Sequence, residues 1–385
     1  MNNTLTTLLI EKVVSKGEGL ARDGNKIWFV PMSLPGEKIV ATPITIKKQF
    51  IKGEVVEIIT PSPHRVTPFC PYYGICGGCD FQHVEYLEGV KIKEKIIIEN
   101  LERIGHIDTN SFTLLPSITG SPLHYRGRVK FSLNQREETV GFLSRGTHDV
   151  VDITSCPLLS PSLNELLNDK RDLLWDKAKK IDPFKKNSVI TISAFEGDNG
   201  LVTLDESEVS VTLLDKKLYV NANVFFQSNK EMLEKMGEIV KEWTVGEAVV
   251  DLYSGIGTFA SLVENDKRTV FAVESDKKCI ALAQKHLKYT SFITTDATKW
   301  LKNRSSISCD TLIVDPPRVG LEPSLINSIG KLNPRHVIYI SCDSATFSRD
   351  ASLLEKVGYT ISTLVFVDMY PHTSHMETVC LLERK

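Results

Sequence analysis

The chain has 385 residues, with 48 acidic and 46 basic side chains and a formal net charge of -2 at pH 7. This balance excludes a globally basic nucleic-acid-binding protein, so any contact with nucleic acid must use local basic patches. Hydrophobic residues make up 42% of the chain, yet no apolar run reaches the roughly 18 residues of a membrane span, so we expect no membrane contact. The length exceeds one typical core and predicts two or three domains.

Residues 1–60 predict a small β-barrel. Apolar runs separated by glycine and proline are typical of short strands joined by turns, and they occur at 27–30, 37–40 and 55–59. Lys47, Lys48 and Lys52 flank Phe50. This basic stretch is either a solvated loop or a contact with a phosphate backbone.

Residues 61–220 predict a central, mostly β unit. It begins with a proline-rich linker and a cysteine cluster. Residues 84–104 carry helical spacing of apolar side chains, and we expect this helix to pack on the C-terminal domain. Beyond residue 120 the pattern favours strands at 129–133, 139–143, 189–192 and 209–212.

Residues 221–385 predict a doubly wound, parallel α/β sheet of the Rossmann type, because apolar runs alternate with helical segments. The expected strands are 249–252, 270–273, 292–294, 312–314 and 337–340, with two further strands at 361–368 and 378–382. Three of these strands end next to Asp251, Asp315 and Cys342. Open α/β sheets bind their ligands at such carboxyl ends.

A glycine-rich turn follows the first of these strands. Gly255 and Gly257 would let a cofactor approach the backbone closely. Glu274 ends the next strand and can accept hydrogen bonds from ribose hydroxyls. Dinucleotide sites, S-adenosylmethionine sites and plain turns share this pattern. The third glycine of the dinucleotide fingerprint is absent, which favours S-adenosylmethionine.

Asp315 and Cys342 suggest covalent chemistry on a planar base. Two prolines after Asp315 stiffen the chain and fix the direction of its carboxylate. A thiolate at Cys342 can add to C6 of a pyrimidine, which makes C5 nucleophilic toward a methyl group. The C5 proton must then leave, and either His375 or Glu377 can act as the base.

The eight cysteines fall into two groups apart from Cys342. The chain begins without a basic segment followed by a long apolar one, so we expect a cytoplasmic protein with reduced thiols. Ordinary buried side chains are expected at Cys279, Cys309 and Cys380. A four-thiolate ligand set is expected at Cys70, Cys76, Cys79 and Cys156. Its ligand count fits zinc or an iron–sulfur cluster, and the residues alone favour zinc.

Taken together, the motifs resemble the S-adenosylmethionine-dependent RNA 5-methyluridine (uracil-C5) methyltransferases over nearly the whole chain. The matching segments, in order, are Phe225 to Asn229, Asp251 to Phe259, Asp315 to Arg318, Ser341 to Asp343 with Arg349 and Asp350, and Asp368 to Pro371 leading to His375 to Thr378. Several motifs in the correct order are far more specific than any one of them.

The resemblance implies roles for individual residues. It implies that Cys342 is the nucleophile and Glu377 the base that removes the C5 proton. It places six residues at the methyl donor: Gln227, Tyr253, Thr258, Glu274, Asp296 and Asp315. It also implies that the four-cysteine set carries a 4Fe–4S cluster, which overrides the zinc expectation.

The implied architecture is a TRAM-like RNA-binding barrel (1–60), a central iron–sulfur domain (61–220) and a Rossmann-like methyltransferase domain (221–385). The implied reaction is methylation of uridine C5 in 23S rRNA by a monomer, with tRNA as the first alternative. The family usually has Asn-Pro after the nucleophile, whereas this chain has Asp343-Ser344. Loss of the proline could loosen the loop, and Asp343 could raise the pKa of Cys342 by charge repulsion.

That departure keeps one other class open, an RNA-binding iron–sulfur protein with a degenerate methyltransferase domain, against which the complete set of Asp315, Cys342 and Glu377 argues. A dehydrogenase is a more distant alternative, which would have to bind a nicotinamide cofactor.

Overall fold

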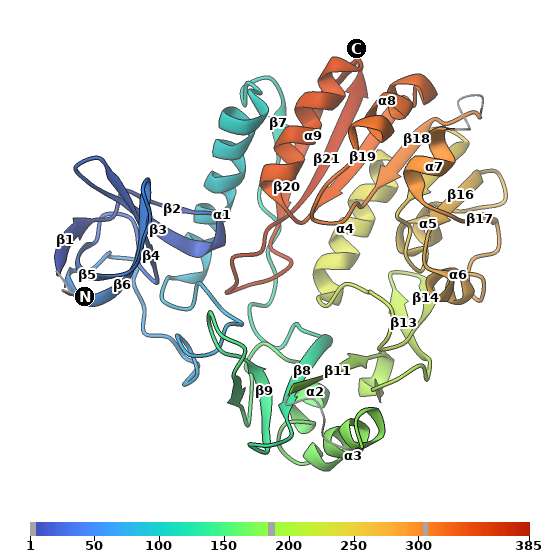
Figure 1. The fold of residues 1–385 in the computed structure, drawn as a ribbon. Helices are drawn as coiled ribbons and strands as arrows, with labels where there is room; N and C mark the ends of the chain where they lie inside the picture. The colour runs from blue at the N-terminus through green and yellow to red at the C-terminus, as the bar shows by residue number, and fades with distance from the viewer. Residues whose placement is uncertain (1–4, 184–188, 303–306) are drawn as a thin grey trace.

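The structure, a computed structural model, describes residues 5–183, 189–302 and 307–385. Figure 1 shows a small β-barrel at the N-terminus, a β-rich unit in the middle of the chain, and a large α/β unit that ends at the C-terminus. Within the described ranges, no helix is long and apolar enough to cross a membrane.

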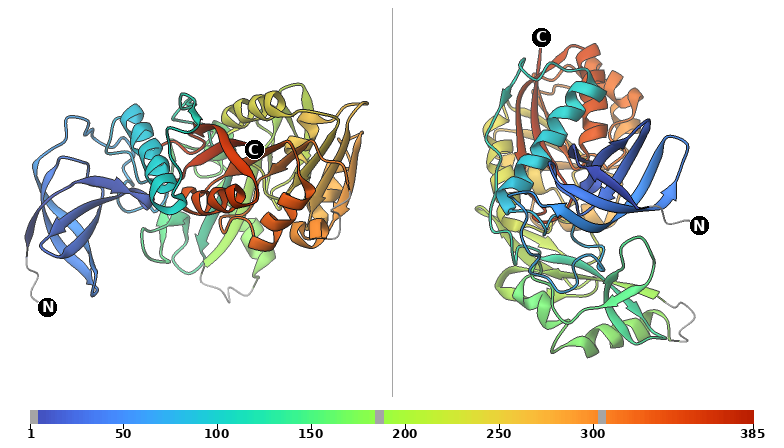
Figure 2. Two further views of the ribbon diagram at one scale, coloured as in Figure 1. Left: turned by 90° about the horizontal axis from the view of Figure 1, so that it is seen from above. Right: turned by 90° about the vertical axis from the view of Figure 1, so that its left-hand side faces the viewer.

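The N-terminal unit is the predicted barrel. Its strands are β1 (Thr6–Leu9), β2 (Lys12–Val14), β3 (Glu18–Asp23), β4 (Lys26–Pro31), β5 (Lys38–Ile46) and β6 (Phe50–Thr60), in the order β1-β5-β6-β4-β3-β2. Alternate residues such as Trp28 and Val30 point into its core. The barrel lies beside α1, and Lys12 in β2 forms an ion pair with Glu99 of that helix (Figure 2).

The central unit contains a five-stranded antiparallel sheet, whose order is β10-β9-β8-β11-β12. Its strands are β8 (Arg128–Asn134), β9 (Thr139–Leu143), β10 (Val150–Asp152), β11 (Val189–Glu196) and β12 (Val202–Thr203). The expectation of mostly strands missed two helices, α2 (Pro161–Glu165) and α3 (Arg171–Ile181). Leu174 and Ala178, one turn apart in α3, are both buried in the core under the sheet.

The helix predicted at 84–104 is confirmed and packs on the large α/β unit. It consists of α1 (Tyr86–Asn100) followed by a π-helical turn (Leu101–Gly105). Ile96, Ile97 and Leu101 are buried in the same core as α9.

The large unit is the predicted doubly wound sheet. Its strands are β15 (Ala248–Leu252), β16 (Thr269–Glu274), β17 (Thr290–Thr294), β18 (Thr311–Val314), β19 (His336–Ser341), β20 (Tyr359–Val367) and β21 (Glu377–Arg384), with short β7 (Thr113–Leu114) at one edge. The order is β17-β16-β15-β18-β19-β21-β20-β7. Strands β15 to β19 are parallel, and β21 runs antiparallel between β19 and β20.

Helices cover both faces of this sheet. They are α4 (Lys230–Trp243), α5 (Thr258–Val263), α6 (Lys277–Ala283), α7 (Ala297–Lys302), α8 (Pro323–Leu332) and α9 (Ser344–Lys356). Leu312 and Val314 face the core shared with α1, α8 and α9, whereas Ile313 faces the core shared with α4 and α5. The hairpin of β13 (Val209–Leu213) and β14 (Lys216–Val220) also packs in this second core. The domain boundary at 220 stays a prediction.

The strand directions bring the expected reactive residues to one edge of the sheet. The carboxyl ends of β15, β18 and β19 carry Tyr253, Asp315 and Cys342. Because β21 is antiparallel to β19, with Ser341 paired to Thr378, its first residue, Glu377, lies next to Cys342 across the strands.

Candidate active site

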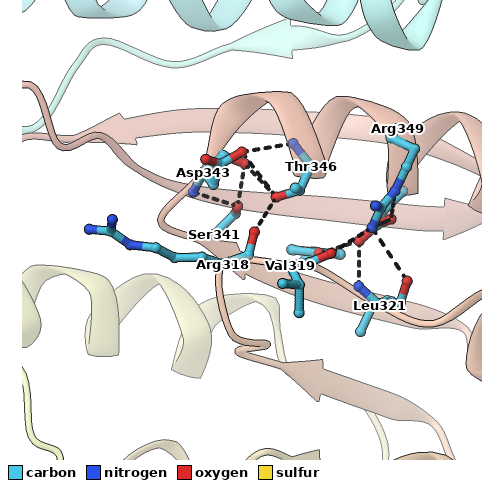
Figure 3. Close-up of polar contacts among 9 residues, drawn as sticks. Arg318, Val319, Leu321, Ser341, Asp343, Thr346 and Arg349 are labelled. Carbon is cyan, nitrogen blue, oxygen red and sulfur yellow. Dashed lines mark hydrogen bonds and ion pairs between the residues drawn. The ribbon is translucent and has the colours of Figure 1, made fainter. Parts of the chain in front are cut away.

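The nucleophile candidate, Cys342, occupies a two-residue connection between β19 and α9. Asp343 caps α9 by accepting a hydrogen bond from the Thr346 backbone N–H at 2.9 Å, and its own N–H donates to the Ser341 hydroxyl at 3.2 Å (Figure 3). The Asp343 carboxylate therefore satisfies the helix N-terminus. This cap fixes the loop that lacks the proline usual in the family.

Burial is the main influence on the Cys342 thiol. It raises the pKa of Cys342 to about 12, with further increases from the charges of Glu377 and Asp315. Arg318 lowers this pKa, and Asp343 raises it in the direction expected from the sequence. The Asp343 departure therefore adds to an effect that burial already dominates.

Helix α9 also fixes the loop that follows Asp315. The Thr346 hydroxyl donates to the Arg318 carbonyl at 3.1 Å, and the Arg349 guanidinium donates to the Val319 carbonyl at 2.8 Å (Figure 3). The Arg318 guanidinium in turn donates to Nδ1 of His375 at 3.0 Å. Arg318 thus lies between the nucleophile loop and the segment that carries the candidate base.

Three carboxyl groups at this edge have raised pKa values, and two of them, Asp251 and Glu377, are buried. Burial raises the pKa of Asp315 to about 7 and, with the charges of Asp315 and Glu274, that of Asp251 to about 8. Burial and Asp315 raise the pKa of Glu377 well above its ordinary value, and Arg318 opposes this. Both Glu377 oxygens and one of Asp251 have no hydrogen-bond partner among the described residues. Unpaired buried carboxyls are rare in folded proteins and favour a functional site.

Glu377 is a better candidate base than His375. Burial and the Arg318 charge lower the pKa of His375 to about 4, and its ring nitrogen accepts the bond from that guanidinium. The imidazole is therefore a weak base with an engaged ring nitrogen, whereas Glu377 has a raised pKa and neither of its oxygens has a hydrogen-bond partner among the described residues.

The glycine-rich turn has the shape expected of a cofactor site. Tyr253, Gly255 and Gly257 adopt left-handed φ angles of 62°, 55° and 77°. The Gly255 N–H donates to Glu274 at 3.0 Å, and a Cβ at Gly255 would meet no atom within 4 Å. The free space beside this turn, with Asp251 and Glu274 next to it, suits a positively charged ligand.

The remaining residues expected at the donor lie around the same edge. Gln227 accepts a hydrogen bond from the Tyr370 hydroxyl at 2.9 Å. The charge of Asp296 is, after burial, the largest influence raising the pKa of Tyr253 to about 12, so these two side chains are neighbours. Thr258 is the first residue of α5, directly after the turn. The roles of Tyr370 and Arg318 were not foreseen, although both lie within motifs that carry the resemblance.

The four cysteines expected to form a ligand set line one cavity of about 670 Å³: Cys70, Cys76, Cys79 and Cys156. The charges of Cys70 and Cys156 are among the influences that raise the pKa of Cys76 after burial, so the thiols are near one another. The described residues hold no group of three or more candidate ligands placed for a metal ion. Cys279, Cys309 and Cys380 are buried, as predicted.

Comparisons with known proteins agree with this arrangement. A family model described as tRNA (Uracil-5-)-methyltransferase matches residues 301–385, and the TRAM domain model matches residues 1–56. The chain is 28% identical to the 23S rRNA (uracil(1939)-C(5))-methyltransferase RlmD of Histophilus somni, over 98% of this chain and 96% of that protein. It is 29% identical to the protein of the same name from Shewanella woodyi, over 98% of this chain and 95% of that protein.

The fold also matches a solved structure over nearly its whole length. The Pyrococcus abyssi tRNA (uracil-54, C5)-methyltransferase, in complex with S-adenosyl-L-homocysteine, superposes with a TM-score of 0.74. The match has 24% identity and covers 98% of this chain and 99% of that one. From the two family models, the chain carries a TRAM domain at its N-terminus and the domain of the RNA uracil-5-methyltransferases at its C-terminus, and the two RlmD proteins are similar to it along nearly its whole length.

Proposed function

We propose that this enzyme methylates C5 of a uridine in 23S rRNA, with Cys342 as nucleophile and Glu377 as base. The observation that carries the proposal is the position of Glu377, which is buried without a partner next to Cys342 across β19 and β21. A carboxyl group left in this state gains nothing for stability. It is suited to accept a proton at the one site where the reaction releases it.

The proposed reaction balances at the uracil ring. The Cys342 thiol loses its proton to solvent, and Arg318 is the cation that favours the thiolate. The sulfur then bonds to C6, and the C5–C6 electrons move to C5, which takes the methyl group. Glu377 accepts the C5 proton. The electrons of that C–H bond restore the C5–C6 double bond, and the thiolate leaves.

S-Adenosylmethionine would supply an electrophilic methyl group on a positively charged sulfur, and the electrons of the broken methyl–sulfur bond would stay on that sulfur, which would leave as a neutral thioether. We propose that it is held by the six residues expected from the resemblance: Gln227, Tyr253, Thr258, Glu274, Asp296 and Asp315. The free space at Gly255, the buried carboxyl of Asp251 and the raised pKa of Asp315 support this assignment. A cationic donor would favour the ionised form of these carboxyls.

We also propose that Cys70, Cys76, Cys79 and Cys156 hold a 4Fe–4S cluster. All four line one cavity, and four thiolates are the donor set of such clusters. The described residues hold no group of three or more side chains already placed for a metal ion, so the choice of the cluster over zinc rests on the family resemblance. The cluster would join the segment before α1 to the central sheet. The proposed chemistry at uracil needs no electron from it.

The choice of 23S rRNA rests on relatives that span almost the whole chain and carry that substrate in their names. The P. abyssi structure makes tRNA the first alternative. In either RNA, the target base must leave its stack to reach a half-buried thiol. We propose the domain division 1–60, 61–220 and 221–385, a monomer, and a cytoplasmic location.

The test uses anaerobically purified protein and isotope-labelled S-adenosylmethionine. It is incubated separately with 23S rRNA and with tRNA that lack 5-methyluridine, and nucleosides are analysed by mass spectrometry. Label in 5-methyluridine from rRNA supports both reaction and substrate. Label only from tRNA overturns the substrate, and no label with either RNA, although the donor binds, favours a degenerate catalytic domain.

A further inference from the structure

The segment between β20 and β21, residues 368–376, directly precedes the candidate base Glu377 and is called the base loop here. It has little regular structure of its own. Four consecutive carbonyl groups of this loop accept hydrogen bonds from four different parts of the chain. The donors are Asn229 to Met369 at 3.2 Å, Lys93 to Tyr370 at 3.0 Å, Tyr125 to Pro371 at 3.1 Å, and the backbone N–H groups of Asp80 and Phe81 to His372 at 3.0 Å each.

One of these parts is the cysteine loop, residues 70–81, which carries three of the four candidate cluster ligands. Asp80 directly follows Cys79 and contacts the base loop twice. Its backbone N–H donates to the His372 carbonyl, and its Oδ2 accepts from the Ser374 N–H at 2.9 Å. Ser374 lies three residues before Glu377.

The other carboxylate oxygen of Asp80 is tied back to the cysteine loop. Its Oδ1 forms an ion pair with Arg145 at 2.9 Å, and Arg145 also donates to the Cys79 carbonyl. The Arg145 backbone N–H donates to the Ile75 carbonyl at 2.8 Å. The Asp80 side chain is only 16% exposed, so these bonds are partly shielded from water.

We propose that Asp80 is a positioning residue that fixes the base loop to the cysteine loop and thereby sets the place of Glu377 relative to Cys342. This inference rests on the proposed function. The bound cluster would hold the shape of the cysteine loop. That shape, through Asp80, determines whether Glu377 can reach the C5 proton. The nucleophile does not depend on Asp80, because the cap on α9 and the end of β19 hold Cys342.

The separation of these two supports predicts which step fails. Replacement of Asp80 releases the Ser374 N–H and leaves the nucleophile loop intact. The covalent bond between Cys342 and C6 should still form, whereas proton removal by a displaced Glu377 should slow by up to about 100-fold. The methylated RNA should therefore accumulate as a covalent adduct with the enzyme.

The experiment compares wild type, Asp80→Ala, Asp80→Asn and the surface control Asp176→Ala, all with their iron content measured. Asp176 is an exposed acid on α3. Each protein is mixed with substrate RNA and S-adenosylmethionine. Free 5-methyluridine product and RNA–protein adduct on denaturing gels are followed over time. We expect Asp80→Ala to lose product and gain adduct, Asp80→Asn to fall between because an amide oxygen can still accept from Ser374, and the control to match wild type.

Two results would overturn the inference. One is wild-type product formation by Asp80→Ala, and the other is a parallel loss of product and adduct in a variant that keeps its iron. If the variants fail to fold, amide hydrogen exchange of the wild-type protein tests the same inference. The Ser374 amide should exchange slowly in the cluster-loaded protein and faster after the cluster is removed. Equal exchange rates in the two forms would contradict the inference. Absence of product and adduct from wild type would instead contradict the proposed function itself.

Discussion

Two glutamates of this protein are almost equally buried but differ in their hydrogen-bond partners and in the direction of their pKa shifts. Glu37, in the barrel, is 0% exposed, and Glu377, at the candidate active site, is 1% exposed. The Glu37 carboxylate accepts from the Leu34 and Ser62 backbone N–H groups and from Arg65. Burial raises the pKa of Glu37, but Arg65 and these N–H groups outweigh it, so that the net pKa is lowered. Glu377 has no such partner, and its pKa is raised.

The difference indicates that buried carboxyl groups in this chain have two separate roles, one in stabilising the fold and one in the proposed reaction. A carboxylate that is fully paired, such as Glu37, holds the barrel to the linker that follows it. A carboxyl that is left unpaired destabilises the fold and is retained where a reaction uses it. The two kinds lie at opposite ends of the base loop, since Asp368 at its start pairs with Lys93 at 2.8 Å and Glu377, directly after its end, is unpaired.

The largest expected effect comes from removing the nucleophile. Cys342→Ala should abolish both 5-methyluridine formation and covalent capture of RNA, because no other thiol follows a strand at this edge in the described ranges. Nucleoside mass spectrometry and denaturing gels measure the two outcomes. Turnover by the variant would exclude Cys342 from the reaction.

The next effect comes from the unpaired glutamate. Glu377→Gln should reduce product formation by about 10²- to 10⁴-fold, the usual contribution of a general base, and should trap the adduct. In wild type, resolution of the adduct should speed up as the pH rises through the raised pKa of Glu377, because only the carboxylate accepts a proton. Single-turnover rates between pH 5 and 9 measure this slope. Free release of methylated RNA by the variant would assign the proton to another group.

The sequence predicted the fold well where the signal is local. Apolar runs gave the parallel strands, and motifs at the strand ends gave Asp315, Cys342 and Glu377. The helix α3 was missed because its apolar residues, including Leu174 and Ala178, are few and are separated by charged ones. The sequence also could not predict which buried charges form pairs, because the partners are far apart in the chain.

The Lys93–Asp368 pair illustrates that limit. The two residues are 275 positions apart, and the pattern of α1 gives no sign that Lys93, among exposed neighbours of the same charge such as Lys91, is fully buried. The contact of Asp80 with Ser374 is likewise absent from any local pattern, at a separation of 294 positions. Both contacts depend on how α1 and the cysteine loop dock on the base loop.

Breaking this paired charge should destabilise the protein more than any surface change. Lys93→Met leaves Asp368 buried without its partner and should lower the free energy of unfolding by about 3–5 kcal/mol. The matched control is Lys91→Met on the same helix, whose side chain is 72% exposed and which should change little. Denaturant unfolding measures both. Equal stability of the two variants would show that the buried pair is not needed.

The paired glutamate of the barrel predicts a smaller loss that depends on pH. Glu37→Gln should cost about 1.5–3 kcal/mol at pH 7, since bonds to a charged acceptor are weakened. The folded-state pKa of Glu37 is lowered, so its contribution is present above the ordinary value near 4.5 and is lost as pH falls through the folded value. The variant and wild type should therefore converge in acid. Glu57→Gln, an exposed change in β6, is the control, and a gap that persists in acid would contradict the assignment.

Replacing Asp251 should change stability in the opposite direction to replacing Glu37, and by the smallest amount of these variants. Its pKa is raised to about 8, mainly by burial, so the folded protein keeps this carboxyl protonated when the unfolded chain has already ionised it. Stability therefore falls as pH rises from the ordinary value of 3.8 toward 8. Asp251→Asn, which stays neutral and can still accept from the Ala260 N–H, should gain on the order of 1 kcal/mol at pH 8. Thermal unfolding from pH 5 to 8 should show a difference in stability between the variant and wild type that widens as the pH rises. Weaker binding of S-adenosylmethionine by the variant would show that the buried acid serves donor binding and destabilises the fold.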